Sequence, residues 1–269
     1  MSLIGTFGAS SVGSFAELLA LLALATARVA PVFAIMPLFG GRIMPHSVRS
    51  AVSLALASLL VPHVQAGVPE IAIRPFPLVG LLVLREVVVG SLLGLLASLP
   101  LLAAEAAGRL LDTIRGVGSG SVFTPQTGGQ SSMLGSFNLH LAIVVLFLTN
   151  GHLLFLRALA ESYDVVPLAP VFAIPSGTRL IGVMAATTGG MMMCALGMAA
   201  PVLATLFLAD LALGLMSRIA PQVPVFFVGM PAKALLGIGA LLLSFWGVIA
   251  ILQGECGAAI AKANGMLRP

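Results

Sequence analysis

Residues 77–104 read PLVGLLVLREVVVGSLLGLLASLPLLAA, an unbroken apolar run whose charged residues are the neighbours Arg85 and Glu86. A helix crosses a hydrocarbon core of ~30 Å with about 20 residues, so this run is long enough for one membrane span. A membrane barrel is disfavoured, because the chain lacks ten-residue apolar alternation and has one Tyr and one Trp to build aromatic girdles. The run therefore predicts a transmembrane helix.

Similar apolar runs follow one another along the whole chain, separated by short polar or Pro/Gly-rich breaks. They lie at about 15–40, 48–66, 137–160, 180–216 and 224–253. The 180–216 run is too long for one span and too short for two. Because Gly189, Gly190 and Pro201 interrupt it, we expect a broken helix or a tight hairpin there.

The composition of the chain agrees with a membrane protein. Of its 269 residues, 59% are hydrophobic and 8% are charged, whereas soluble domains carry about 25% charged residues. A soluble globule cannot cover that much apolar surface, so a soluble enzyme and a disordered tail are disfavoured. The net charge of +4 arises from too few charges to form a nucleic-acid-binding face.

We therefore expect an all-α, polytopic membrane protein made of hairpins with Pro/Gly-broken helices. No basic segment precedes the first apolar run, so we expect that run to be retained.

Five ionisable residues fall inside the apolar runs: Arg28, Arg85, Glu86, Asp210 and Lys233. Charges at membrane depth face protein or water, so they either form an ion relay or pair with each other or with partner subunits. We favour pairing, because the carboxylates are scattered. Arg85 and Glu86 are adjacent and point about 100° apart on a helix, so we expect them to face different partners.

The basic residues give the chain no preferred orientation in the bilayer. Assigned to alternating sides of six spans, they divide into five and six. The positive-inside rule requires an asymmetry. Either the six spans are assigned wrongly, or the protein does not sit in the bilayer as an ordinary bundle of helices.

No catalytic, metal or cofactor site is predicted. The four histidines are dispersed, no carboxylate completes a metal-binding cluster, and Ser131-Ser132 lacks a nucleophile-elbow motif. The two cysteines lie in apolar surroundings without ligand spacing.

The most polar stretch, at about 105–136, divides into a helix end and a loop. Residues from Glu105 to Asp112 place charges at helical spacing. Residues 115–132 are rich in Gly and Ser and predict a loop. Within the preceding run, Gly90 and Gly94 form a small-xxx-small pattern that permits close helix–helix contact.

Five motifs in order resemble the FliR family of flagellar export-gate proteins and its injectisome counterpart, the SctT family. They are Pro37–Pro45 followed by Val48-Arg49, Arg85–Gly94, Ser121–Gly128, Phe147–His152 and Arg218–Lys233. Two positions depart from the family pattern: Thr124 replaces a common Asp, and Pro224 a common Asn.

The resemblance implies a non-enzymatic core subunit of the type III protein export gate. FliP-like and FliQ-like subunits, FlhB-like and FlhA-like proteins and unfolded export substrates would be its partners. The expected location is the bacterial inner membrane, within the flagellar basal body or an injectisome base. The whole chain, 1–269, would form one FliR-like domain, with a FliP-like half at about 1–160 and a FliQ-like half at about 161–269.

A gate for unfolded chains must close at rest, because an open pore would leak ions. We expect the 115–132 loop to be the plug, since its glycines permit rearrangement and its apolar side chains add bulk. The predicted plug residues are Gly116, Gly118, Gly120, Phe123, Pro125, Gln126, Gly128 and Met133. The alternative is a surface loop that touches a partner subunit.

A second expected site is the Pro-rich segment 218–233, which would be a rigid hairpin tip that docks on a partner. The alternative is a plain turn between two apolar helices. The residues predicted to contact other subunits are Arg42, Arg85, Glu86, Gly90, Gly94, Arg218, Pro221, Gln222 and Lys233.

The rival class is a secondary transporter or small-molecule permease that acts alone. Broken helices and buried charges are typical of that class as well. A transporter would show an internal repeat, and the sequence shows none.

Overall fold

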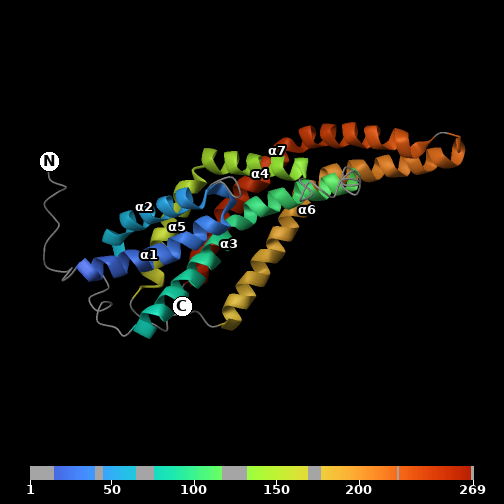
Figure 1. Ribbon diagram of the computed structural model, residues 1–269. Coiled ribbons are helices and arrows are strands. Elements are labelled where there is room, and N and C mark those ends of the chain that lie inside the picture. The colour runs from blue at the N-terminus through green and yellow to red at the C-terminus, as the bar shows by residue number, and fades with distance from the viewer. Residues whose placement is uncertain are drawn as a thin grey trace. The chain divides into compact units, whose positions relative to one another are not determined.

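The computed structural model describes residues 15–39, 45–64, 76–116, 132–168, 177–222 and 224–267, and these ranges contain helices and no strand. The elements are α1 (Phe15–Ile35), the 3-10 helix η1 (Pro37–Phe39), α2 (His46–Val64), α3 (Phe76–Ile114), α4 (Met133–Leu148), α5 (Gly151–Val165), α6 (Gly177–Ile219) and α7 (Val225–Leu267), as Figure 1 shows. The predicted all-α class is confirmed.

Four helices are long and apolar enough to cross a membrane. Their candidate spans are Leu18–Ile35, Leu78–Ile114, Ile181–Ile219 and Phe227–Gly254. The pair α4 and α5 adds a fifth if its two helices, bent by 76° at the junction, count as one broken span. The chain is therefore a polytopic membrane protein. The six spans read from the apolar runs are too many, because α2 is apolar only over the shorter stretch His46–Pro62.

The structure keeps residues 180–216 in one helix and forms no hairpin there, although α6 changes direction part-way along its length (Figure 1). Helix α6 runs for 43 residues with Pro201 in its interior. A proline removes one backbone hydrogen bond and a glycine weakens a helix by about 1 kcal/mol. Neither effect outweighs the need of an apolar segment to satisfy its backbone groups internally. The helix is interrupted between α4 and α5, where Asn150 adopts a φ of 57°.

The chain divides into two compact units. The first comprises residues up to Ser98, then Leu153–Val183 and the C-terminal residues from Ile260, and the second comprises Leu99–His152 and Met184–Ala259. The proposed FliP-like and FliQ-like halves, divided near residue 160, concern likeness to other subunits and stay a prediction.

Helices α1, α2, α5 and the first part of α3 form the core of the first unit. Its buried cluster consists of Leu21, Leu24, Val64, Leu82, Tyr163 and Leu168. The predicted close contact of the small-xxx-small pattern occurs here, between α3 and α1. A Cβ on Gly90 would overlap the Arg28 carbonyl oxygen, and a Cβ on Gly94 would lie 2.9 Å from Val32 Cα.

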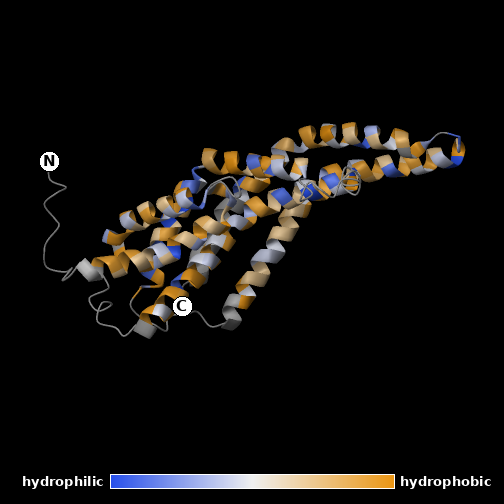
Figure 2. Ribbon diagram, in the orientation of Figure 1, coloured by the Kyte–Doolittle hydropathy of each residue, from blue (hydrophilic) through white to orange (hydrophobic). Residues whose placement is uncertain are grey.

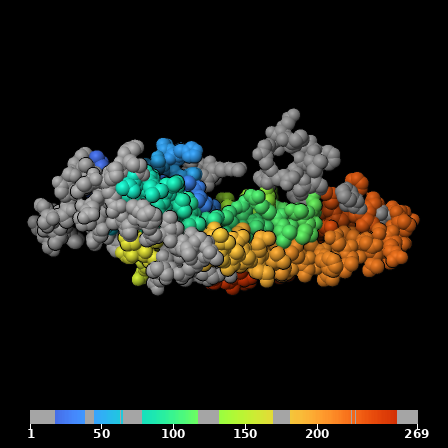
Figure 3. All heavy atoms as spheres, turned by 90° about the horizontal axis from the view of Figure 1, so that it is seen from below, coloured from blue at the N-terminus to red at the C-terminus, as the bar shows by residue number. Residues whose placement is uncertain are grey.

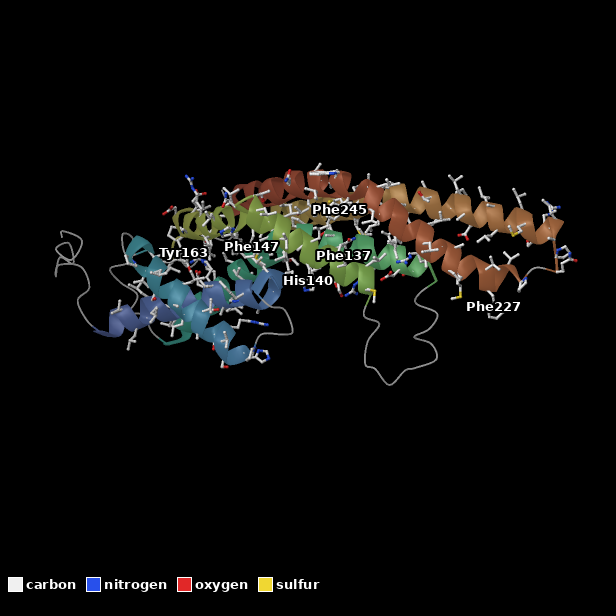
Figure 4. The ribbon with its side chains drawn as sticks, turned by 90° about the horizontal axis from the view of Figure 1, so that it is seen from above. Phe137, His140, Phe147, Tyr163, Phe227 and Phe245 are labelled. Carbon is white, nitrogen blue, oxygen red and sulfur yellow. The ribbon has the colours of Figure 1, made fainter. Side chains whose placement is uncertain are left out.

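In the second unit, α6 and α7 form a long antiparallel hairpin joined by a short turn (Figure 1). Hydrophobic residues dominate both arms, and hydrophilic residues gather at the turn (Figure 2). Figure 3 shows α6 as a broad surface beside the end of α3. Many large apolar side chains of the hairpin are exposed, among them Phe207, Leu208, Ile219, Phe227, Leu235, Leu243 and Trp246. Phe227, at the start of α7, is labelled in Figure 4.

Candidate functional site

The deepest charges of the first unit form an ion pair between α1 and α3. Arg28 Nε lies 2.5 Å from Glu86 Oε2, and both side chains are fully buried, at 0% exposure. Glu86, Gly90 and Gly94 follow one another at intervals of four residues and share a face of α3. The backbone of α1 sits on the two glycines, which brings the Arg28 side chain to Glu86.

Arg28 also binds the C-terminal end of α5. Its Nη1 donates to the Ser162 carbonyl oxygen at 2.9 Å, and its Nη2 donates to the Val166 carbonyl oxygen at 2.8 Å. The guanidinium carbon lies 4.1 Å from the centroid of the Tyr163 ring, which is labelled in Figure 4. The Tyr163 hydroxyl in turn donates to the Ala25 carbonyl oxygen at 3.1 Å. A cation at a helix C-terminus, where carbonyls lack helical partners, is favourable.

Arg85 reaches the same segment from the neighbouring position on α3. Its Nη2 donates to the Pro167 carbonyl oxygen at 2.7 Å, and its Nη1 lies 3.9 Å from Glu86 Oε1. Arg85 and Glu86 therefore have different main partners, as expected: Glu86 pairs with Arg28 of α1, and Arg85 donates to the Pro167 carbonyl oxygen. The two side chains also approach each other, because the long arginine side chain can bend back toward its neighbour.

These buried charges pair within the chain. Their role is structural, because Arg28, Arg85 and Glu86 join three helices and the two arginines donate to carbonyl oxygens at the end of α5. These contacts lie inside the first unit and involve Arg85, Glu86, Gly90 and Gly94. That the same four residues also contact another subunit stays a prediction. Removing one partner of such a pair leaves an uncompensated buried charge, at a cost of about 3–5 kcal/mol.

In the second unit, Asp112 connects the end of α3 to the start of α4. Its Oδ2 accepts hydrogen bonds from Ser132 Oγ at 2.7 Å and from the Leu134 backbone N–H at 2.9 Å. Ser132 is the N-cap of α4 and accepts from the Gly135 N–H at 2.8 Å. Two of the unpaired N–H groups at the start of α4 are thus satisfied, one of them by a carboxylate that the helix dipole favours.

Arg115 extends this connection to α7. Its Nη1 lies 3.4 Å from Asp112 Oδ1, and its Nη2 donates to the Ala234 carbonyl oxygen at 3.2 Å. Gly237 leaves room for the arginine, because a Cβ there would lie 3.0 Å from Arg115 Cδ. Gly116 follows with a φ of +78°, the left-handed conformation in which glycine commonly ends a helix.

The predicted hairpin tip is a turn between α6 and α7. Arg218 lies in the last turn of α6, and Pro221 and Gln222 are exposed in the turn itself. Lys233, in α7, forms an ion pair with Asp210 of α6. A cavity of about 240 Å³ lies beside this pair, and its lining residues include Arg115, Gly116 and Gly229.

The structure covers part of the predicted site. Gly116 and Met133 mark the ends of the predicted plug loop, and Met133 is 80% exposed. Gly118, Gly120, Phe123, Pro125, Gln126, Gly128 and Arg42 lie outside the described residues. Within the described ranges, no group of three or more His, Cys, Asp or Glu side chains could hold a metal ion.

Sequence reasoning missed two contributors, Tyr163 and Ser132. For Ser132 a signal existed, because a serine just before an apolar run is a typical helix N-cap. For Tyr163 no local pattern indicates the contact with Arg28, which lies far away in the sequence.

The protein has long apolar helices and many exposed apolar side chains, and its buried ion pairs form within the chain. These features define a polytopic helical membrane protein whose charged groups hold helices together. Residues 19–259 match the family described as Bacterial export proteins, family 1, and the chain belongs to this family. The predicted FliR/SctT relationship is confirmed.

Relatives of this chain come from both flagellar and secretion systems. The chain is 30% identical to the flagellar biosynthetic protein FliR of Bacillus subtilis (strain 168), over 89% of this chain and 92% of that protein. It is 33% identical to the Yop proteins translocation protein T of Yersinia pestis, over 78% and 79% respectively. It is 32% identical to the surface presentation of antigens protein SpaR of Shigella flexneri, over the same shares.

Proposed function

We propose that this protein is a core subunit of a type III protein export gate. With FliP-like and FliQ-like subunits it forms the channel through which unfolded substrates cross the bacterial inner membrane. The observation that carries the proposal is the family match over residues 19–259. The names of the relatives, which include a flagellar biosynthetic protein and a translocation protein, support it.

The surface of the α6–α7 hairpin also supports an assembly role. Phe207, Leu243 and Trp246 are among its exposed apolar side chains, whereas Asp210 and Lys233 neutralise each other. An apolar surface of this kind suits contact with other apolar helices as well as with lipid. Its role in this proposal is to pack against neighbouring subunits.

The remaining partners follow from the same proposal. An FlhB-like protein binds at the channel entrance, and an FlhA-like protein delivers substrates. The location is the inner membrane within a flagellar basal body or an injectisome base. The protein itself carries out no chemical reaction and needs no cofactor or metal.

The 115–132 loop is proposed as the plug of the resting channel. Its Gly-rich sequence permits rearrangement, and Phe123 and Met133 supply apolar bulk. Deleting Gly116–Gly129 should raise ion leakage in cells that express the complex, measured with a potential-sensitive dye. Unchanged leakage would refute the plug role.

The turn between α6 and α7 is proposed as a docking tip. Arg218, Pro221, Gln222 and Lys233 would contact a partner there. The ion pair of Lys233 with Asp210 affects this contact, because a carboxylate of the partner must compete with Asp210 for the Lys233 ammonium group.

Co-purification tests the proposal as a whole. An affinity-tagged chain, expressed with its genomic neighbours, should be isolated in a complex with FliP-like and FliQ-like subunits. A protein that is purified alone, and that moves a small solute when reconstituted, would instead be a transporter, for which the bent pair α4–α5 would be the broken span.

A further inference from the structure

The ends of α3 and α4 meet in a cluster of buried and half-buried polar groups. We call it the loop-base cluster, and it consists of Asp112, Arg115, Ser132 and the backbones of Leu134 and Ala234. Asp112 and Arg115 are 7% and 8% exposed. The cluster lies where the described chain leaves α3, after Gly116, and where it resumes, at Ser132. It consists of residues from both sides of that gap together with one carbonyl of α7.

The two oxygens of the Asp112 carboxylate have different partners. Oδ2 holds the start of α4 through Ser132 Oγ and the Leu134 N–H. Oδ1 faces Arg115, which donates onward to the Ala234 carbonyl oxygen. One side chain therefore connects α4 and, through Arg115, α7 to the same point of α3.

The backbones at this junction are also in close contact. A Cβ on Gly108 would lie 2.5 Å from the Gly135 nitrogen, and a Cβ on Gly135 would lie 2.8 Å from Arg109 Cγ. Helix α4 thus begins directly against α3. Separating the two helices would leave the Leu134 N–H and the Asp112 carboxylate without these partners, which is costly for buried groups.

We infer that Asp112 is a positioning residue, which fixes the two ends of the 117–131 segment to each other and to α7. The inference rests on the proposed plug role only for its functional consequence: α3 and α4, which flank residues 117–131, stay attached to each other while a substrate passes. Asp112, Ser132 and Arg115 act through hydrogen bonds and charge and need not touch an export substrate.

Spin labels test this inference in the assembled complex. Thr113 and Met133 are exposed on either side of the cluster, so Thr113→Cys and Met133→Cys provide a labelling pair in a chain without its two native cysteines. We expect a narrow distance distribution by pulsed electron paramagnetic resonance. Asp112→Ala should broaden the distribution and lengthen its mean.

The matched control is Glu105→Ala, which removes a carboxylate from the same helix. Glu105 pairs with the exposed side chain of Arg109 on its own helix, so the label distances should not change. Asp112→Asn distinguishes the hydrogen bonds to α4 from the attraction to Arg115. The amide oxygen can still accept from Ser132 and Leu134, whereas the attraction to Arg115 is lost, so the broadening should be smaller than for Asp112→Ala.

An unchanged distribution in Asp112→Ala would overturn the inference. If that variant does not accumulate, unchanged distributions in both Ser132→Ala and Asp112→Asn would overturn it instead. Ion leakage of the same variants separates this inference from the proposed plug. Broadening with added leakage supports both, and broadening without leakage supports the loop-base cluster while it contradicts the plug.

Discussion

The Arg28–Glu86 pair of the first unit and the Lys233–Asp210 pair of the second join the same kinds of charge in opposite surroundings. Arg28 and Glu86 are fully buried, and Arg28 also binds two carbonyl oxygens at the C-terminal end of α5, those of Ser162 and Val166. Lys233 and Asp210 are 21% and 45% exposed and lie beside a cavity. The comparison teaches that burial and additional hydrogen bonds, rather than charge type, separate a structural ion pair from one that a partner can rearrange.

The largest effect should come from breaking the buried pair. Glu86→Ala leaves the Arg28 guanidinium buried without its carboxylate, and the expected loss of stability is about 3–5 kcal/mol. The chain should be degraded or fail to enter the complex, which immunoblotting of membranes and co-purification would measure. Replacing both partners, as in the Arg28→Met/Glu86→Leu double variant, should be milder, because no Arg28 guanidinium is then left buried without its carboxylate. A double variant as damaging as Glu86→Ala would contradict this account.

The next largest effect should come from the helix contact that sets the register of the buried pair. Gly90→Val places side-chain atoms where the Arg28 carbonyl oxygen lies, and overpacking of this kind costs about 1–3 kcal/mol. The thermal unfolding midpoint of the purified complex should fall. Gly80→Val is the matched control on the same helix, because nothing lies within 4 Å of a Cβ there. Equal destabilisation by both variants would show that loss of glycine itself, and not the contact with α1, is responsible.

The exposed pair should matter little for stability and more for assembly. Partly exposed ion pairs contribute about 0–1 kcal/mol, so Lys233→Ala should leave chain abundance close to that of the unchanged protein. Under the proposed docking role, Lys233→Glu should reduce export, because it reverses the charge and repels Asp210. Secretion assays would measure this change. Export at the unchanged level with Lys233→Glu would favour a plain turn.

The smallest effect is expected at Arg157 and Glu161, an i,i+4 pair on the surface of α5. Such pairs contribute about 0.3–0.5 kcal/mol, so Arg157→Ala should shift the unfolding midpoint only slightly. A large shift would mean that this surface is covered by another subunit in the assembled complex.

The sequence predicts the helical class and most of the apolar helices, because a hydrophobic run long enough to span a bilayer is a local property. The run 77–104 corresponds to α3, which the structure extends to Ile114. The extension joins the apolar run to the charged helix end of residues 105–112, which helical charge spacing had already indicated.

The sequence does not predict where helices are interrupted or which charges meet. Pro201 and Gly189 lie within a continuous helix, whereas the helix is interrupted at Asn150, whose environment depends on packing. Arg28 and Glu86 are 58 residues apart, and Arg28 and Ser162 are 134 apart. Pairings over such distances depend on the tertiary fold, so the sequence indicates only that buried charges need partners.

The contacts of Arg28 also bear on how the newly made chain enters the membrane. The first apolar helix is synthesised with a guanidinium whose carboxylate lies on α3 and whose carbonyl partners lie at the end of α5. Until Val166 has been made, Arg28 lacks part of its set of carbonyl partners at the end of α5. We therefore expect α1 to remain at the insertion machinery or near the aqueous interface during synthesis, and to reach its final depth only as part of a group of helices.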